Sequence, residues 1–246
     1  MNIKNPFPLL LGGKFLYCAF EFQETENYFG NFRNIGGFIA SEGTEICSVQ
    51  DAEKRFWETT GKTYDANAEF SIITVRISDR LLQDNSCLFH AVAIMHQNKA
   101  WLISGPPGVG KTTQYRNLKE LYPDEFEMIC GDKPMLSLEN DGQIMVYPTP
   151  WNGKEGLRGD TAFPLAGIIF LRRGDQNKIT PIKPFEAVIP FYRSIIQSAE
   201  TEDILKQASS LMNCILQRVP SWSMTSAIIP DSTELLYNEV FSSYEQ

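Results

Sequence analysis

The sequence contains few of the residues that build disulfide frameworks and metal centres. Its five cysteines are odd in number, widely separated and include no C-x-x-C pair; they are Cys18, Cys47, Cys87, Cys130 and Cys214. This pattern argues against a disulfide framework and against a zinc site. We therefore expect reduced, mostly buried thiols in a cytoplasmic protein.

Long apolar runs and an excess of positive charge are also lacking. No apolar run approaches the roughly 18 to 20 residues that span a bilayer. The 22 Lys and Arg residues against 30 Asp and Glu give a formal net charge of −8, whereas a nucleic-acid binder needs a basic face. We expect neither a membrane nor a nucleic-acid partner. With 43% hydrophobic residues in a chain of 246, the composition is typical of one large domain or of a core with a smaller partner.

One segment in the middle of the chain carries a specific motif. It fits the phosphate-binding loop (P-loop) pattern G-x-x-x-x-G-K-[ST] and consists of Gly105, Pro106, Pro107, Gly108, Val109, Gly110, Lys111, Thr112 and Thr113. Residues 100–104 before it resemble a buried strand, and residues 113–121 after it have helical spacing. In this arrangement backbone N–H groups and a lysine hold the phosphates of a nucleotide, and a hydroxyl binds Mg²⁺. A plain glycine-rich turn leaves the Lys-Thr pair unexplained.

The two ends of the chain differ in pattern. Residues 1–85 have apparent strands at 15–22 and 70–77 and a short helix at 54–60, which predict an antiparallel, β-rich N-terminal lobe. From residue 86 to 246 the pattern becomes α/β. In that part we expect strands at 88–95, 100–104, 126–130, on both sides of a turn at 139–142, and at 166–171, with helices at 113–121, 185–193, 202–216 and 232–241.

Asp132 follows the first strand after the predicted P-loop helix. This position is at the carboxyl edge of the sheet, near the bound phosphates. A carboxylate there can coordinate Mg²⁺ or accept a proton from an attacking hydroxyl. The alternative is a turn aspartate in the segment Gly-Asp-Lys-Pro.

Other candidates are weaker on pattern alone. His90 lies in the predicted strand 88–95, where a hydrogen-bonded core histidine is commoner than a catalyst, and His96 falls in a predicted surface turn. The loop 148–155 is dense in turn formers and charges, which is compatible with a binding loop or an ordinary surface loop. Arg172 and Arg173 end an apolar strand, where they either contact phosphate or are solvated.

Taken in order, these segments resemble a known family. They are Phe-His-Ala at 89–91, the P-loop, Ile-Cys-Gly-Asp-Lys-Pro at 129–134, Thr-Pro-Trp-Asn-Gly-Lys-Glu at 149–155, and Pro-Leu at 164–165 before the strand 167–171. The set resembles the kinase domain of the HPr kinase/phosphorylase superfamily, which is itself similar to the nucleotide-binding part of ATP-dependent phosphoenolpyruvate carboxykinase. The resemblance runs from about residue 86 to the C-terminus; residues 1–85 match no family that we can name.

The resemblance implies an α/β P-loop core, with ATP (or GTP) and Mg²⁺ as cofactors. It makes Lys111 the phosphate-binding lysine, Asp132 the base toward the acceptor hydroxyl, and His90 a histidine near the phosphates. Thr112 and Asp132 would bind the metal together with a downstream acid, for which Glu155 and Asp160 are the candidates. One departure is Lys133, because bifunctional members have an acidic pair at this point.

These observations predict a kinase that transfers the γ-phosphate to a hydroxyl. By the resemblance, the acceptor is a serine of a peptide or small protein, with a small-molecule alcohol as the alternative, and a homo-oligomer is an expected partner. A degenerate module that binds nucleotide or peptide without chemistry stays open, because of Lys133 and the unplaced metal acid. An ATPase of the AAA type is disfavoured, since the strand 166–171 ends in two arginines and no carboxylate.

Overall fold

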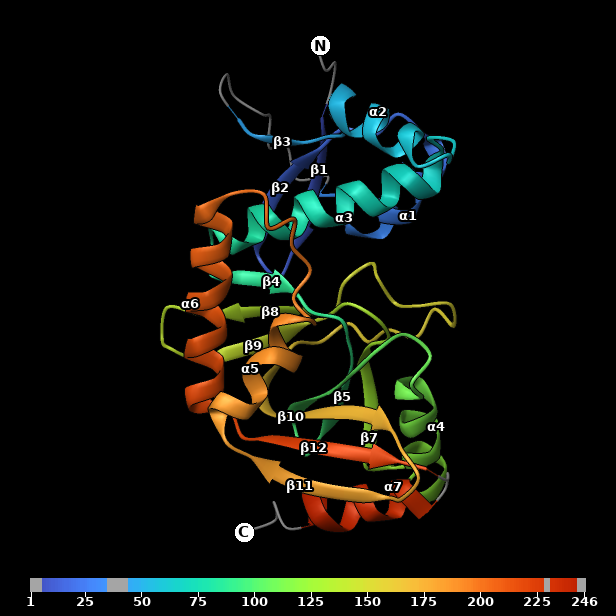
Figure 1. The fold of residues 1–246 in the computed structure, drawn as a ribbon, viewed down its shortest axis with the longest axis vertical. Coiled ribbons are helices and arrows are strands. Elements are labelled where there is room, and N and C mark those ends of the chain that lie inside the picture. Colours follow the sequence, from blue (N-terminus) through green and yellow to red (C-terminus); the bar gives the residue numbers. More distant parts are fainter. Residues whose placement is uncertain (1–5, 35–43, 228–230, 243–246) are drawn as a thin grey trace.

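The computed structural model describes residues 6–34, 44–227 and 231–242. The predicted units 1–85 and 86–246 therefore each include residues outside the described ranges. We refer to residues 6–85 as the N-terminal region and to residues 86–242 as the α/β region. Figure 1 shows the N-terminal region packed against one end of the α/β region.

The N-terminal region contains more helix than strand. Its elements are β1 (Phe7–Leu11), β2 (Lys14–Cys18), α1 (Gln23–Phe29), the 3₁₀ turn η1 (Gly30–Phe32), β3 (Ile46–Cys47), α2 (Asp51–Thr59) and α3 (Ala66–Leu82). The strands β1 and β2 form an antiparallel hairpin, and β3 pairs in parallel with β2. The predicted short helix at 54–60 is confirmed, and strand β2 covers only the first part of the predicted strand 15–22. The prediction of a β-rich lobe is wrong.

The predicted strand at 70–77 is part of helix α3. The β-branched residues there favour a strand locally, but other signals outweigh this preference. The side chain of Asp65 caps the helix by accepting hydrogen bonds from the N–H groups of Asn67 (3.0 Å) and Ala68 (2.9 Å). Ile73 and Ile77, four residues apart, are then buried together in one core.

The α/β region follows the predicted order more closely. Its strands are β4 (Ser86–Leu88), β5 (Ala91–His96), β6 (Lys99–Ser104), β7 (Phe126–Cys130), β8 (Met135–Leu138), β9 (Ile144–Tyr147), β10 (Phe163–Arg173), β11 (Lys178–Ile182) and β12 (Ser221–Ser226). Its helices are α4 (Lys111–Leu121), α5 (Pro184–Tyr192), α6 (Glu202–Arg218) and α7 (Asp231–Leu236), followed by the π-helical turn η2 (Tyr237–Phe241). These confirm every helix predicted in this region.

The strands of the α/β region form one mixed sheet. The strand order is β4-β8-β9-β10-β6-β5-β7, and β12 also pairs with β10 and carries β11 on its far side. The long strand β10 joins two parts, because its start pairs with β9 and its later residues lie between β6 and β12. The described structure is therefore a mixed α/β fold, as predicted.

The strand directions bring three chain segments to one edge of this sheet. Strand β5 is antiparallel to both β6 and β7, so its start lies beside their ends. Ala91 pairs with Ser104, and the N–H of Ala91 donates to the carbonyl oxygen of Asp132 (2.9 Å). His90, the segment after Ser104 and Asp132 therefore meet at this edge.

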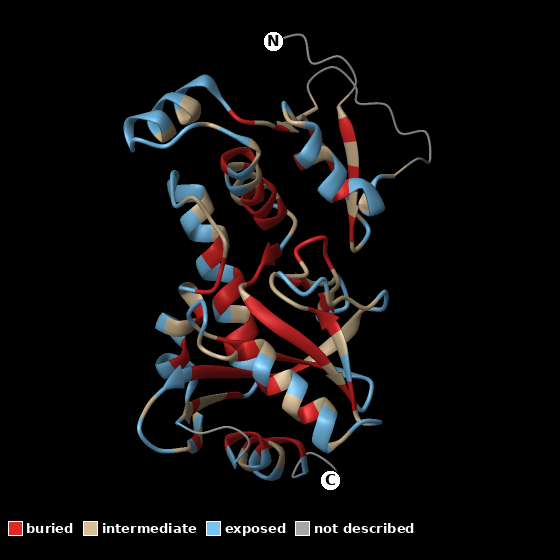
Figure 2. Cartoon of the chain, turned by 90° about the vertical axis from the view of Figure 1, so that its right-hand side faces the viewer, coloured by how far each residue is buried: buried red, intermediate tan, exposed pale blue. Residues whose placement is uncertain are grey.

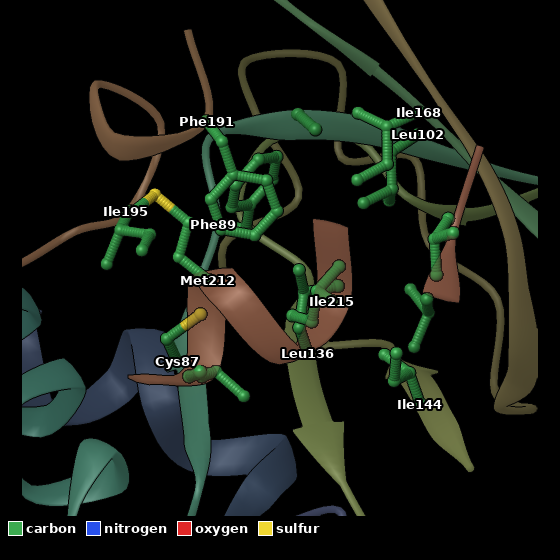
Figure 3. Packing of buried hydrophobic residues seen from close by; sticks show 14 of the residues in the cluster. Cys87, Phe89, Leu102, Leu136, Ile144, Ile168, Phe191, Ile195, Met212 and Ile215 are labelled. Carbon is green, nitrogen blue, oxygen red and sulfur yellow. The ribbon is translucent and has the colours of Figure 1, made fainter. Parts of the chain in front are cut away.

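Alternating side chains cover both faces of the sheet. Ala91, Ala93 and Leu102 point into a core with helices α5 and α6, whereas Val92 and Trp101 point into a core with α4 and α7. In Figure 2 the buried strands lie between helices that are exposed on their outer sides. Figure 3 shows the α5–α6 core, in which the ring of Phe89 lies against that of Phe191. Their centroids are 4.7 Å apart.

A third core joins the N-terminal region to the α/β region. It includes Phe29 and Ile77 from the first and Leu88, Met135 and Trp151 from the second. This shared core crosses the predicted boundary at residues 85 and 86.

Two predictions in the α/β region need correction. The predicted strand 88–95 is two strands, β4 and β5, because the chain changes partners at Phe89 and His90. The N–H of Phe89 donates to Pro134 O (3.0 Å), and that of His90 to Ser194 O (2.7 Å). His96 is not in an exposed turn; it is 2% exposed and stacks on Phe126 with a centroid distance of 4.7 Å. None of the described helices is long and apolar enough to cross a membrane.

Candidate functional site

The loop of residues 105–110 connects strand β6 to helix α4 at the sheet edge. Gly108 and Gly110 have φ angles of +72° and +112°, which disfavour residues with a side chain, and α4 begins directly after Gly110. A Cβ on Gly105 would lie 2.3 Å from Leu171 O, so only glycine allows the loop to pass this close to strand β10. The predicted strand, glycine-rich turn and helix therefore follow one another in space, with the first N–H groups of α4 at the edge.

Lys111 is a buried cation with no carboxylate partner among the described residues. It is 8% exposed, and its Nζ donates to Gly105 O (2.9 Å) and Pro106 O (3.4 Å). The same atom lies 3.2 Å from Nε2 of His90. Burial lowers the pKa of Lys111, because desolvation penalises its charged form. The charge of Asp132 acts in the opposite direction on this pKa, but the hydrogen-bond partners of Lys111 are neutral, so an anion that enters beside the ammonium stabilises it.

His90 lies between Lys111 and Asp132. Its Nε2 is 3.2 Å from Lys111 Nζ and 3.5 Å from Asp132 Oδ1. The packing of the neighbouring Phe89 on Phe191 holds this part of the chain (Figure 3). Burial, followed by the charge of Lys111, lowers the pKa of His90, although the carboxylate of Asp132 acts in the opposite direction. The neutral imidazole is therefore favoured.

Asp132 reaches the edge through a close contact between two loops. A Cβ on Gly131 would lie 2.5 Å from Asn152 O, so glycine is required where the end of β7 meets the loop that follows Trp151. The N–H of Lys133 donates to Trp151 O (3.0 Å). The Lys133 ammonium forms an ion pair with Oδ2 of Asp132, which leaves Oδ1 toward His90. Lys133 thus occupies one oxygen of the candidate base.

The two candidates for the downstream metal acid have different surroundings. Glu155 pairs with Arg116 (3.0 Å), which follows Thr112 by four residues on α4. The side chain of Asp160 is 94% exposed and lies 3.7 Å from Arg158. This placement favours Glu155 over Asp160 as the downstream acid.

The donor chemistry at this edge is compatible with Mg²⁺. Thr112, Asp132 and Glu155 offer oxygen atoms, which Mg²⁺ prefers. The described residues contain no cluster of three His, Cys, Asp or Glu side chains able to hold a metal by itself. Mg²⁺ commonly takes one or two carboxylates and completes its coordination with phosphate oxygens and water. A site of this kind requires the nucleotide.

Arg193 and Ser194 at the edge escape sequence reasoning, and Arg173, a sequence candidate, has a partner that the sequence did not predict. Arg173 donates from Nη2 to Gly108 O (2.7 Å) and so holds the P-loop from the end of β10. Ser194 Oγ lies 2.7 Å from Ser104 Oγ, which connects the end of α5 to the end of β6. Arg193 lines a cavity beside the P-loop. Only the strand-end position of Arg173 signals a role in the sequence; Arg193 and Ser194 are brought here by the packing of α5.

Comparisons with known proteins identify no family for the chain. No family model matches it, and no curated protein matches it. One solved structure that matches is the Hpr(Ser) kinase/phosphatase from Coxiella burnetii, with 12% sequence identity over 64% of this chain and 98% of that chain, at a TM-score of 0.37. This similarity is too low to support a functional argument, which depends instead on the geometry of the sheet edge.

Proposed function

We propose that this protein is a kinase that transfers the γ-phosphate of ATP, or of GTP, to a hydroxyl group. The observation that carries this proposal is the position of Lys111. It is a buried cation without a carboxylate partner among the described residues, at the end of a glycine-rich loop, and only His90 separates it from Asp132. An anion site beside a carboxylate is what phosphoryl transfer to a hydroxyl needs.

The chain's own groups account for triphosphate binding. The N–H groups of the loop and of the first turn of α4 donate to phosphate oxygens, and Lys111 neutralises the β- and γ-phosphates. Thr112, Asp132 and Glu155 would hold Mg²⁺, which supplies further charge neutralisation when bound. Arg173 keeps the loop in place through its bond to Gly108 O (2.7 Å).

Asp132 is the group that we assign to the acceptor. Its carboxylate accepts the proton of the acceptor hydroxyl while the acceptor oxygen bonds to the γ-phosphorus and the bond from that phosphorus to the bridging oxygen breaks. The nucleoside diphosphate then leaves with the electron pair of that bond. His90 and Lys133 position the carboxylate from either side. We propose a serine of a peptide or small protein as the acceptor, with a small alcohol as the alternative.

A binding module without chemistry is the second candidate. The Lys133–Asp132 ion pair favours it, since Lys133 occupies one oxygen of the carboxylate that would accept the proton. An AAA-type ATPase remains disfavoured, because strand β10 beside β6 ends in Arg172 and Arg173 and not in adjacent carboxylates.

Transfer of label from γ-³²P-ATP tests the proposal. The protein is incubated with Mg²⁺ and serine-containing peptides or small alcohols. We expect Asp132→Asn to lower transfer by about 10²- to 10⁴-fold while it keeps ATP affinity, and Lys111→Ala to lose ATP binding. The exposed Asp175, between β10 and β11, provides the matched control Asp175→Asn.

The pattern of label separates the candidate functions. Label on an acceptor that is lost in Asp132→Asn supports the kinase. Release of inorganic phosphate without a labelled acceptor supports an ATPase. Tight ATP binding with neither product, including in Lys133→Ala, supports the binding module.

A further inference from the structure

A cavity of about 670 Å³ lies beside the P-loop, on the sheet face that packs against α5. His90 and residues Gly105 to Pro107 form one side of it. Its other walls come from the end of β10, the end of β11, helix α5 and Ser223 of β12. The sequence predicts no function for this cavity.

The cavity opens at the γ-phosphate end of the proposed nucleotide site. Lys111, which reaches the β- and γ-phosphates in a P-loop, bonds to the carbonyls of Gly105 and Pro106, and these residues also line the cavity. Thr112 and Thr113 start α4, which packs on the opposite face of the sheet. The cavity and α4 therefore lie on opposite faces of the sheet, and the cavity adjoins the loop residues that contact Lys111.

The lining combines apolar walls with cations. Phe170, Ile182 and Pro190 supply apolar surface. Arg172 and Arg193 are exposed at the cavity, and neither forms an ion pair with another described residue; Arg172 donates to Thr225 Oγ1 (2.9 Å). Glu186 is the one carboxylate in the lining, so the two arginines leave an excess of positive charge. Such a lining suits an apolar group that carries a nearby anion.

Helix α5 extends this surface beyond the cavity. Glu186, Pro190 and Arg193 recur at helical spacing and face the cavity. Next to this stripe, Phe185 is 72% exposed and Ile189 is 63% exposed. Large exposed apolar side chains continuous with a cavity are typical of a surface that binds a polypeptide. A small alcohol would leave this stripe uncovered.

We propose that the cavity and the adjoining face of α5 bind a polypeptide acceptor next to its hydroxyl. A large apolar side chain of the acceptor enters the cavity between Phe170 and Ile182, and a carboxylate of the same segment pairs with Arg193. This inference depends on the proposed kinase function for the identity of the ligand as the acceptor.

An array of serine-centred nonapeptides tests the inference. Each flanking position is varied through all residue types, and the array is read twice, for bound protein in the presence of ADP and for ³²P transferred from ATP. Wild type is compared with Arg193→Glu and with Ser223→Phe, which fills part of the cavity. Arg55→Glu is the matched charge control, because Arg55 is exposed on α2, far from the cavity lining.

We expect wild type to prefer a large apolar residue and an Asp or Glu near the serine by about tenfold over alanine. Arg193→Glu should change the acidic preference to Lys or Arg, and Ser223→Phe should remove the preference for large apolar residues. Arg55→Glu should keep the wild-type ranking. Thermal melting identifies a variant that fails to fold. If Ser223→Phe does not fold, Arg193→Glu still tests the inference, because Arg193 is exposed.

The two readouts separate the inference from the kinase proposal. Labelled peptides with one ranking in all variants overturn the inference and support the kinase. The expected preferences in binding, without label on any peptide, overturn the kinase and support the peptide site. If no peptide binds and no peptide is labelled, both proposals are overturned.

Discussion

The α/β region and the N-terminal region contribute to the candidate site in different ways. The α/β region supplies His90 and Asp132 from beside strand ends and Lys111 from the start of α4, and the sheet order brings these segments together. The N-terminal region reaches the site through Trp151. The N-terminal region therefore influences where Asp132 lies, whereas the loop 105–110 is contacted by Leu171 and Arg173 of strand β10.

Trp151 connects the N-terminal region to the segment that carries Asp132. The indole Nε1 donates to Thr74 Oγ1 of α3 (2.8 Å), and the ring packs edge-on against Phe29 of α1 with a centroid distance of 5.2 Å. The backbone of Trp151 accepts the N–H of Lys133 (3.0 Å), next to Asp132. We expect substitutions in these contacts to change the free energy of unfolding and the rate of phosphate transfer but not the affinity for the nucleotide.

The largest effect is expected for Trp151→Ala. The side chain is fully buried, and its removal leaves a cavity between the two regions, so we expect a loss of about 3–5 kcal/mol in the free energy of unfolding. Urea denaturation measures it. Phe56→Ala, at a residue 71% exposed on α2, is the control and should change stability by less than about 0.5 kcal/mol. Equal losses in both variants would contradict the central role of Trp151.

Gly131→Ala should have the next largest effect. Its Cβ would lie 2.5 Å from a backbone oxygen, and relieving this clash displaces Asp132 at a cost of about 1–3 kcal/mol. We expect phosphate transfer to fall while ATP affinity, measured by calorimetry, is retained. Gly30→Ala is the matched control, because no atom lies within 4 Å of its Cβ position. Loss of ATP affinity in Gly131→Ala would show that the two contributions are not separate.

Thr74→Val sharpens the comparison at one hydroxyl group, which accepts from Trp151 and also donates to Phe70 O (2.7 Å). The change keeps the shape of the side chain but leaves the buried Trp151 N–H without its acceptor, which costs about 1–2 kcal/mol. Thr74→Ser keeps the hydroxyl and should lose less stability than Thr74→Val. If the two variants are equally stable in urea, packing alone holds Trp151.

The smallest effect concerns a second link between the regions. Asp79 of α3 accepts the N–H of Ser198 (3.1 Å), and burial raises the pKa of this carboxyl above its ordinary value. The folded state therefore holds the proton more tightly than the unfolded state, and stability falls as pH rises through the unfolded and then the folded pKa. We expect Asp79→Asn to gain stability relative to wild type between about pH 4 and pH 7. Urea denaturation at several pH values in this range measures the free energy of unfolding of both proteins. A difference between them that does not change with pH would contradict this prediction.

Contiguous features of the α/β region were predictable. The turn at 139–142 has polar turn residues between two apolar runs, and strands β8 and β9 confirm the predicted pair. The P-loop pattern and its flanks lie within one short segment, so spacing alone predicted β6 and the start of α4. The N-terminal region was less predictable, because the β-branched run in α3 favours a strand until its packing against the neighbouring core is included.

Some features of the candidate site were predictable from the sequence and others were not. The sequence predicted that Asp132 lies at the carboxyl edge of the sheet, but it did not predict that β5 lies between β6 and β7 or that β4 and β5 are separate strands. The salt bridge of Glu155 with Arg116, and the bond from Arg173 to Gly108, join residues far apart in the sequence. Sequence spacing does not encode such distances.

The sequence by itself determined the glycine-rich loop, the lysine and hydroxyl that follow it, and the alternation that builds the sheet, because each depends on neighbours in the chain. Only the tertiary structure decided that Glu155 pairs with Arg116, that Trp151 joins the two regions, and that α5 closes a cavity beside the loop. The physical reason is that burial and charge pairing depend on which distant segments the sheet order brings together.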